Sequence, residues 1–228
     1  RGRRVIALSE YGLVPVSGPV HINRVLREAG LLAIRDELGT DTLDAGASEA
    51  FAVSDHQVAH VYVRNPGRIA EVEALLRKVP GIDLVLDRNE QRGLGLDHER
   101  SGELVAISAR DRWFTYYFWL DDNKAPDYAR TVDIHRKPGY DPAELFVDPK
   151  LTAPKLTVAA TLAKKALGFR YLMNVIPLDA SLVKGSHGRV TESLDDGPLL
   201  ISSERGGVKK ETLESTGVRD VILAHLFD

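Results

Sequence analysis

Blocks of apolar residues separated by polar stretches predict alternating strands and helices along the first half of the chain. An apolar run at residues 5–8 predicts a buried strand. Apolar residues then recur at helical spacing over residues 17–38, opened by Ser17 as a cap and Pro19 in the first turn. Residues 50–63 are rich in valine and aromatics and predict one or two strands.

The same alternation continues to residue 120. A helix is predicted from Asn65-Pro66 to residue 79, and residues 82–87 predict a strand. Two more strands, 103–108 and 113–120, are separated by a short turn. Strands that alternate with helices in this way predict an α/β sheet with crossover helices.

Regular patterning fails in the middle of the chain and returns near its end. Residues 121–155 mix prolines, glycines and charges, which is typical of a functional segment or a surface excursion. Helices are predicted over residues 153–167 and from Thr216 onward.

Composition limits the function classes. The chain has 228 residues, of which 43% are apolar and 28% charged, so it is an ordinary globular protein with enough residues for a core. A formal charge of −3 and a pI near 6.2 give no electrostatic case for a nucleic acid polymer or an anionic membrane. The absence of cysteine excludes disulfides, Cys-ligated zinc and thiol catalysis, and is typical of a cytoplasmic protein.

The first residues raise a question about completeness. The chain begins Arg-Gly-Arg-Arg without a methionine, and the strand at residues 5–8 follows almost at once. A strand buried on both faces needs neighbours from elsewhere in a protein. We therefore expect the chain to be a fragment.

His56 and His60 in "DHQVAH" have the spacing of a helical zinc pair, but their valine-rich surroundings predict a strand. On a strand, residues four apart lie about 13 Å from each other, too far to share one ion. A hydrogen-bonded structural role is therefore the favoured interpretation for Asp55-His56.

The segment "DIHRKPGYDP" offers a different chemistry, because its basic side chains surround a Pro-Gly turn. His135 and Lys137 could hold a phosphate or a carboxylate there, although an anchored surface loop is favoured from this stretch alone. The aromatic run at residues 116–119 predicts core or a subunit contact. The Gly93-Leu94-Gly95 stretch lacks a third glycine and a following helix, so it is no dinucleotide fingerprint.

Two short motifs place polar groups where α/β sheets bind ligands. "SEYG" puts Glu10 and Tyr11 after the first strand, and "GSHG" puts His187 between glycines. Alone, Glu10 could cap the next segment and His187 could be a turn residue. Together they predict a metal site assembled from distant strand ends.

Four stretches, in order, resemble the alkaline phosphatase superfamily, nearest its nucleotide pyrophosphatase/phosphodiesterase branch. These are "VIALSEYGL", where that branch has a strand ending Ser-Asp-His-Gly, "PGIDLVLDRNEQRGLGLDHERSGELVAIS", "KGSHGR" and "DDGPLLIS". The "SEYG" and "DHQVAHVYV" segments are similar to those of an uncharacterised bacterial subgroup. Residues 121–179 have no counterpart general to the superfamily.

The resemblance implies a phosphoric ester hydrolase, either a phosphodiesterase or a nucleotide pyrophosphatase. Two divalent ions, usually zinc, would clamp the phosphoryl group of a small phosphorylated substrate such as a nucleotide. His187 matches the last metal-ligating histidine and Glu10 a metal-binding aspartate. Tyr11 replaces a ligating histidine, and a neutral phenol is a much poorer zinc ligand. The chain would then bind one ion, use a harder metal such as manganese, or lack hydrolysis.

The resemblance covers only part of the family's active site. The family's nucleophile and first ligands lie N-terminal to the strand that residues 5–8 match, so the N-terminal half of the same protein is an implied partner. Tyr11 is then a candidate hydrogen-bond donor in catalysis, and His135, Lys137 and Arg189 are candidates for holding substrate. By itself, the fragment is expected to be inactive.

The implied fold is α/β, the C-terminal portion of a three-layer alkaline-phosphatase-like sheet with crossover helices. Residues 1–120 would belong to the core, 121–180 to an irregular excursion with a helix, and 181–228 to a return carrying the metal-ligand loop and terminal helix. Two alternatives stay open: a non-catalytic binding protein on this fold, and a related metal-dependent phosphotransferase or mutase.

Overall fold

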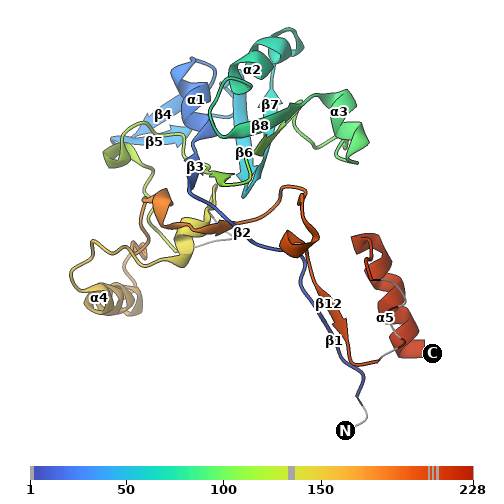
Figure 1. Cartoon of the computed structure of the whole chain (residues 1–228). Helices are drawn as coiled ribbons and strands as arrows, with labels where there is room; N and C mark the ends of the chain where they lie inside the picture. The colour runs from blue at the N-terminus through green and yellow to red at the C-terminus, as the bar shows by residue number, and fades with distance from the viewer. Residues whose placement is uncertain (1–2, 133–136, 205, 207, 209–210, 228) are drawn as a thin grey trace. The chain divides into compact units, whose positions relative to one another are not determined.

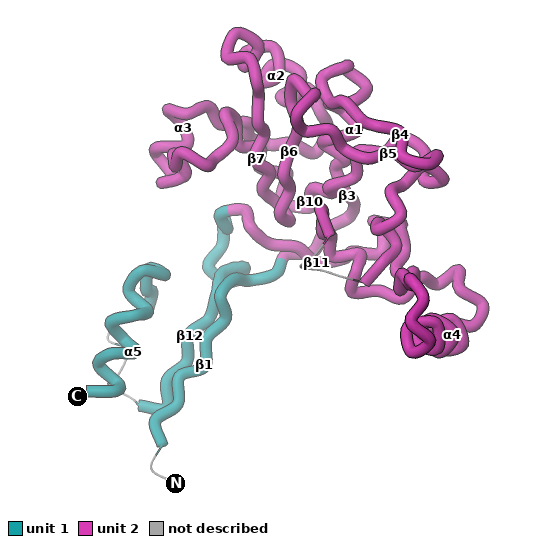
Figure 2. Tube along the Cα trace, turned by 180° about the vertical axis from the view of Figure 1, so that it is seen from behind, with its two compact units in different colours: residues 1–13, 190–228 teal, residues 14–189 magenta. Residues whose placement is uncertain are grey.

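The computed structural model describes residues 3–132, 137–204, 206, 208 and 211–227. It divides into two compact units, coloured separately in Figure 2. The larger unit comprises residues 14–189, and the smaller comprises residues 1–13 with 190–228. The three-part division predicted at residues 120 and 180 stays a prediction.

A four-stranded sheet organises the larger unit (Figure 1). Its strands, in spatial order, are β6 (Ala50–Asp55), β7 (Val58–Val63), β9 (Leu104–Ser108) and β8 (Ile82–Leu86). Every neighbouring pair is antiparallel. Since β7 and β8 both oppose β9, they run parallel to each other, and α2 (Ile69–Leu76) connects them as a crossover helix. The predicted mixed α/β class, with a crossover helix, is confirmed.

Local sequence signals explain the helices on either side of β8. Asn65 caps the turn η1 (Pro66–Arg68) by accepting a hydrogen bond from the Gly67 N–H, and α2 follows directly. Asp87 opens α3 (Arg88–Gly93) with a complete capping box that includes Glu90. The helix α3 was not predicted, although the Asp-x-x-Glu spacing is its signature.

The helix predicted over residues 17–38 is largely wrong. Residues Gly18–Val20 form β3, which pairs in parallel with β10 (Arg112–Phe114), and only Ile22–Glu28 form a helix, α1. Gly30, at φ 71°, turns the chain out of α1. The strands β4 (Ile34–Glu37) and β5 (Thr40–Leu43) then form a hairpin, where the sequence predicted helix and loop.

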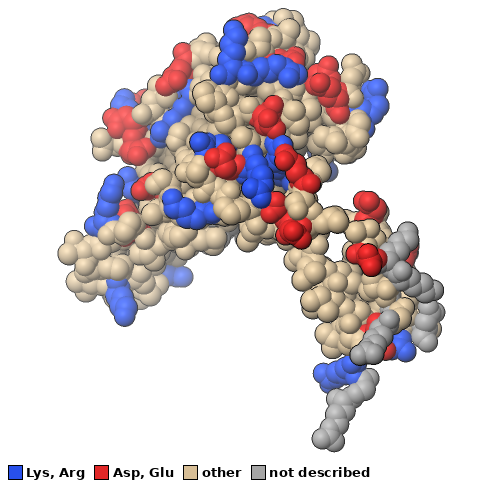
Figure 3. Space-filling model, in the orientation of Figure 1, with Lys and Arg blue, Asp and Glu red and all other residues tan. Residues whose placement is uncertain are grey.

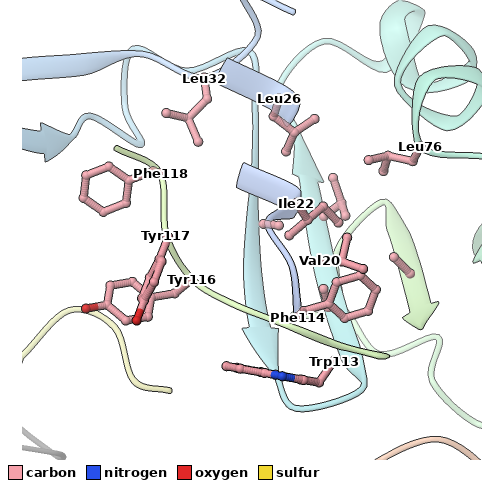
Figure 4. Packing of buried hydrophobic residues seen from close by; sticks show 14 of the residues in the cluster. Val20, Ile22, Leu26, Leu32, Leu76, Trp113, Phe114, Tyr116, Tyr117 and Phe118 are labelled. Carbon is pink, nitrogen blue, oxygen red and sulfur yellow. The ribbon is translucent and has the colours of Figure 1, made fainter. Parts of the chain in front are cut away.

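The core of the larger unit lies between the sheet and α1, α2 and the aromatic run (Figure 4). Ile22, Leu26 and Leu76 are fully buried. The predicted strand at 113–120 is regular only to Phe114, but its aromatic residues are buried, as the core interpretation predicted. The rings of Tyr117 and Trp119 stack with centroids 4.4 Å apart.

The remainder of the larger unit is mostly irregular, as predicted for residues 121–155. Its elements are η2 (Asp122–Lys124), η3 (Pro142–Leu145), α4 (Pro154–Ala166), η4 (Ala180–Leu182) and the short pair β2 (Val14–Pro15) with β11 (Gly185–Ser186). The predicted helix at 153–167 is therefore confirmed as α4. Basic and acidic side chains are interspersed over the face of this unit seen in Figure 3.

The smaller unit is a two-stranded ribbon with a helix. The strand β1 (Ile6–Leu8) pairs antiparallel with β12 (Leu200–Ser202). The remaining elements are η5 (Leu194–Asp196), η6 (Ser215–Gly217) and α5 (Val218–Phe227), which confirms the predicted last helix. The Nε2 of His225 in α5 lies 2.6 Å from Ser202 Oγ, which ties the helix to the ribbon.

The first strand is not buried, contrary to the prediction from its apolar run. Val5 is 56% exposed and Leu8 49% exposed. The reason is that β1 has one strand neighbour, β12, among the described residues. Within the described part of the chain, no helix is both long and apolar enough to cross a bilayer.

Candidate metal and phosphate site

His187 directly follows β11 and meets the turn between β6 and β7, which is distant in sequence. Its backbone oxygen accepts a 2.9 Å hydrogen bond from the Gln57 N–H. Its imidazole packs against that of His56, with ring centroids 3.9 Å apart and planes inclined by 36°. Two imidazoles, one predicted as a ligand and one not, therefore form the centre of the candidate site.

The turn between β6 and β7 holds His56 in position. It has two residues, His56 and Gln57, between paired Asp55 and Val58. His56 adopts φ 54°, the left-handed conformation that two-residue hairpin turns require. Gln57 is buried, and its side-chain amide donates to the backbone oxygens of Arg110 and Arg112. These bonds hold the turn against the segment that connects β9 to β10 (Arg112–Phe114).

Burial controls the electrostatics of His56. Its pKa is lowered first by burial and then by the neighbouring His187, while Asp55, 3.8 Å from Nε2, opposes the shift. Two buried polar atoms here, His56 Nδ1 and Ser186 Oγ, have no hydrogen-bond partner among the described residues. Both atoms are therefore able to form a further hydrogen bond beside His187.

The residues after His187 are held by backbone conformation and by an ion pair. Gly188 adopts φ 110°, a conformation open in practice only to glycine. Arg189 Nη1 lies 2.5 Å from Asp83 Oδ2 and 3.0 Å from the Ser108 backbone oxygen. Arg189 therefore anchors this segment to the sheet, and its predicted contact with substrate stays a prediction.

His60 does not join this site. It lies within β7, and its Nδ1 accepts a 3.2 Å hydrogen bond from the Gly102 N–H. Burial and Arg88 lower its pKa. Because one ring is in the strand and the other in the turn, the helical zinc-pair interpretation does not apply.

Glu10 and Tyr11 lie in the smaller unit, immediately after β1. Ser9 links the end of this strand to Leu199 through two 2.9 Å hydrogen bonds, one from its backbone N–H and one to its hydroxyl. A Cβ at Gly12 would collide with the backbone oxygen of Asp196. The glycine of "SEYG" is thus required by close backbone packing, while Glu10 is exposed.

The predicted ligands are divided between the two units, His187 in the larger and Glu10 with Tyr11 in the smaller. Across the residues that the structure describes, no group of three or more His, Asp and Glu side chains is arranged to hold a metal ion. The donor types fit zinc or manganese, because imidazole nitrogen and carboxylate oxygen bind both. Metal binding by His187 and Glu10 stays a prediction.

Lys137 is buried rather than displayed on a surface loop. Its ammonium lies 2.5 Å from Glu144 Oε1, and the two side chains are 3% and 2% exposed. It also donates to the Thr131 backbone oxygen at 3.0 Å. Its predicted role in holding substrate stays a prediction, and the neighbouring candidate His135 lies outside the described residues.

His56 was not predicted as the partner of His187. The available signal was a two-residue gap between two valine-rich strands, which predicts a tight hairpin with His56-Gln57 at its tip. No spacing rule could have shown that this tip meets residue 187, more than a hundred residues along the chain.

Comparison with known proteins gives a family match. Residues 1–141 match the family described as type I phosphodiesterase / nucleotide pyrophosphatase. A search of curated proteins gave no match.

Two solved structures show distant similarity. One is phosphonoacetate hydrolase from Sinorhizobium meliloti in complex with phosphonoacetate, with 17% identity over 50% of this chain and 28% of that one, and a TM-score of 0.34. The other is murine ectonucleotide pyrophosphatase / phosphodiesterase 5, with 19% identity over 49% and 26% of the respective chains, and a TM-score of 0.33. The chain thus spans less than a third of the length of either.

Proposed function

This chain belongs to the type I phosphodiesterase / nucleotide pyrophosphatase family, and we propose that it forms the C-terminal part of a metal-dependent phosphoric ester hydrolase. The family match over residues 1–141 carries this proposal, because it includes "SEYG" and the His56 turn. The substrate class is a small phosphorylated molecule such as a nucleotide.

We assign His187 and Glu10 as metal ligands, with zinc or manganese as the ion. When bound, the ion supplies Lewis-acid stabilisation of negative charge on the phosphoryl oxygens. The role of His56 is to fix the orientation of the His187 ring, 3.9 Å away between centroids. Tyr11, with its neutral phenol, donates a hydrogen bond to the substrate phosphate or to water.

The nucleophile and the remaining ligands come from the N-terminal half of the same protein. The smaller unit supports this assignment, since the side chains of Val5 and Leu8 at β1 are half exposed. A strand of this composition normally lies inside a sheet. Further strands from the N-terminal half would cover it.

One rival function is favoured by a specific residue. Tyr11 stands where the family has a ligating histidine, and loss of that ligand would leave a phosphate-binding protein without hydrolysis. The number of metal ions bound per chain separates the two functions.

The test uses the full open reading frame. We expect the wild-type protein to bind a divalent metal and to hydrolyse bis(p-nitrophenyl) phosphate only in its presence. His187→Ala should lower the bound metal per chain and reduce turnover at least about a hundredfold, because a ligand is lost. Metal content is measured by inductively coupled plasma mass spectrometry.

His98→Ala is the matched control, since His98 is an exposed histidine of the larger unit. This variant should leave both the bound metal per chain and the turnover unchanged. Protein that stays metal-free and inactive after supplementation with zinc and with manganese would contradict the hydrolase assignment. Bound metal without turnover would favour the binding protein.

A further inference from the structure

A polar cavity of about 360 Å³ lies within the larger unit, and none of its lining residues is a predicted ligand or substrate contact. His21 and Arg24 line it from the start of α1, and Tyr117 from the aromatic run. Lys150 and Asp179 line it from the segment beyond residue 141, where the family match ends. The cavity therefore combines the family's part of the chain with a segment outside it.

The aromatic wall of this cavity is held by ring stacking, a hydrogen bond and an ion pair. The His21 and Tyr117 rings stack with centroids 5.7 Å apart and planes inclined by 12°. Trp119 stacks on Tyr117 and donates from Nε1 to Asp122 Oδ1 at 3.0 Å. Arg24 pairs with the same carboxylate at 3.0 Å, and its guanidinium carbon lies 5.7 Å from the Tyr117 ring centroid.

Hydrogen-bond donors are left over in the cavity. The Tyr117 hydroxyl and the Lys150 ammonium line the cavity and form no hydrogen bond or ion pair with a described residue. His21 Nδ1 is paired with the Thr115 hydroxyl, and the donor or acceptor role of its Nε2 depends on the tautomer. Burial raises the pKa of Tyr117, so its hydroxyl stays protonated and can donate. Lys150 brings a positive charge and three N–H donors.

The acidic groups, by contrast, already accept hydrogen bonds. Asp122 accepts from Trp119 and Arg24. Asp148 accepts from the Lys150 backbone N–H, and Asp179 accepts from both the N–H and the hydroxyl of Ser181. The Ser181 hydrogen bonds, and also the Lys150 charge, lower the pKa of the Asp179 carboxyl. The hydrogen-bonding capacity left in this cavity is therefore that of the Lys150 N–H groups and the Tyr117 hydroxyl, which suit an oxyanion as acceptor.

We propose that this cavity binds the oxyanion group, phosphate or carboxylate, of a small molecule, with Lys150 and the Tyr117 hydroxyl as its principal donors. The site goes beyond the proposed hydrolase function and uses none of its residues. Since the segment beyond residue 141 supplies Lys150, the site would be a specificity or regulatory feature of this chain, separate from the chemistry of its family.

Calorimetric titration of the 228-residue chain tests this site. The probes are inorganic phosphate and malonate, each raised to about 20 mM, above the millimolar range of weak single-site binding. Metal is removed beforehand by passage over a chelating resin, so that no metal at His187 contributes and no soluble polycarboxylate competes for the site. Ionic strength is held constant with chloride. A change in tryptophan fluorescence, to which Trp119 contributes through its stack on Tyr117, is a second readout.

Three variants locate the binding. Lys150→Ala should weaken the affinity about tenfold, the effect of losing a charged hydrogen bond. Tyr117→Phe removes only a hydroxyl and should weaken it about fivefold. Lys155→Ala, an exposed lysine of α4 outside the cavity lining, should leave it unchanged.

The probes distinguish the two sources of the oxyanion. If only phosphate binds, the cavity accepts a phosphoryl group, and if only malonate binds, it accepts a carboxylate. If both bind, the cavity accepts either group. Absence of binding by both probes would overturn the proposal. So would an equal loss in Lys150→Ala and Lys155→Ala, which would indicate non-specific attraction to surface charge.

Discussion

At the scale of single residues, Lys137 shows how burial decides the role of a charged group. In sequence it lies beside Pro138-Gly139, a context in which a lysine could hold an anion, although an anchored surface loop is favoured there. In the structure its side chain is 3% exposed and its ammonium pairs with Glu144. Removing the lysine takes a positive charge away from the buried Glu144 carboxylate, and breaking a buried pair in this way is strongly destabilising.

Lys137→Ala should therefore lower the free energy of unfolding by about 3 to 5 kcal/mol. Urea denaturation followed by circular dichroism measures this loss. Lys155→Ala, at an exposed position of α4, should change the stability by less than about 0.5 kcal/mol. Unchanged stability in Lys137→Ala, accompanied by weaker substrate binding, would instead support the substrate role predicted from sequence.

His21 makes the stability depend on pH. Burial, and next Arg24, lower its pKa to about 4 from 6.5, while Asp122 opposes the shift. Between these values the unfolded chain binds a proton at this position that the folded chain does not, so stability is lost as the pH falls from 6.5 towards 4. The full effect corresponds to about 3 kcal/mol.

His21→Gln removes this titration while keeping a polar group for Thr115. We expect its stability to fall less than that of the wild type between about pH 7 and pH 4.5, as measured by urea denaturation at each pH. His56 and His60 also have lowered pKa values, but they are common to both proteins, so the difference isolates His21. Parallel pH profiles for the two proteins would show that His21 does not contribute.

At the scale of elements, the segment from β11 to His187 depends on one backbone conformation. Gly188 has φ 110°. Gly185, three residues earlier, lies in β11, where an added Cβ would meet nothing closer than the Val14 backbone oxygen at 3.9 Å. Gly188→Ala should cost about 1 to 3 kcal/mol because alanine is strained at this φ. Gly185→Ala should be nearly neutral.

Thermal denaturation of the two variants measures this difference. A second reading comes from the metal content of the full-length protein, which should fall in Gly188→Ala because His187 is displaced. If both alanines cost the same, the strain at residue 188 would not be what holds His187 in place.

The elements also show where sequence patterns succeed. The hairpin at 50–63 and the helix at 154–166 follow from local periodicity and β-propensity, and both are present. The helix predicted at 17–38 failed because tertiary pairing overrides local preference. Gly18–Val20 are recruited as a strand by β10, nearly a hundred residues away, and Gly30 interrupts the helical spacing.

At the scale of the whole molecule, candidate sites depend on contacts that no local pattern contains. "GSHG" marks His187 as a candidate, but its packing against His56 comes from the meeting of β11 with the β6–β7 turn. The oxyanion cavity likewise joins α1 to residues 148–181. Motifs can therefore nominate single side chains, while the surroundings that tune them require the fold.

The strand order β6-β7-β9-β8 also determines when the sheet can close during folding. The β6–β7 hairpin needs only a two-residue turn and can form within microseconds. The strand β8 precedes β9 in the chain, yet β9 is its sole strand neighbour in the described sheet. Until residues 104–108 insert between β7 and β8, the crossover helix α2 connects a finished hairpin to an unpaired strand. Closure of this larger loop should therefore set the folding rate of the larger unit.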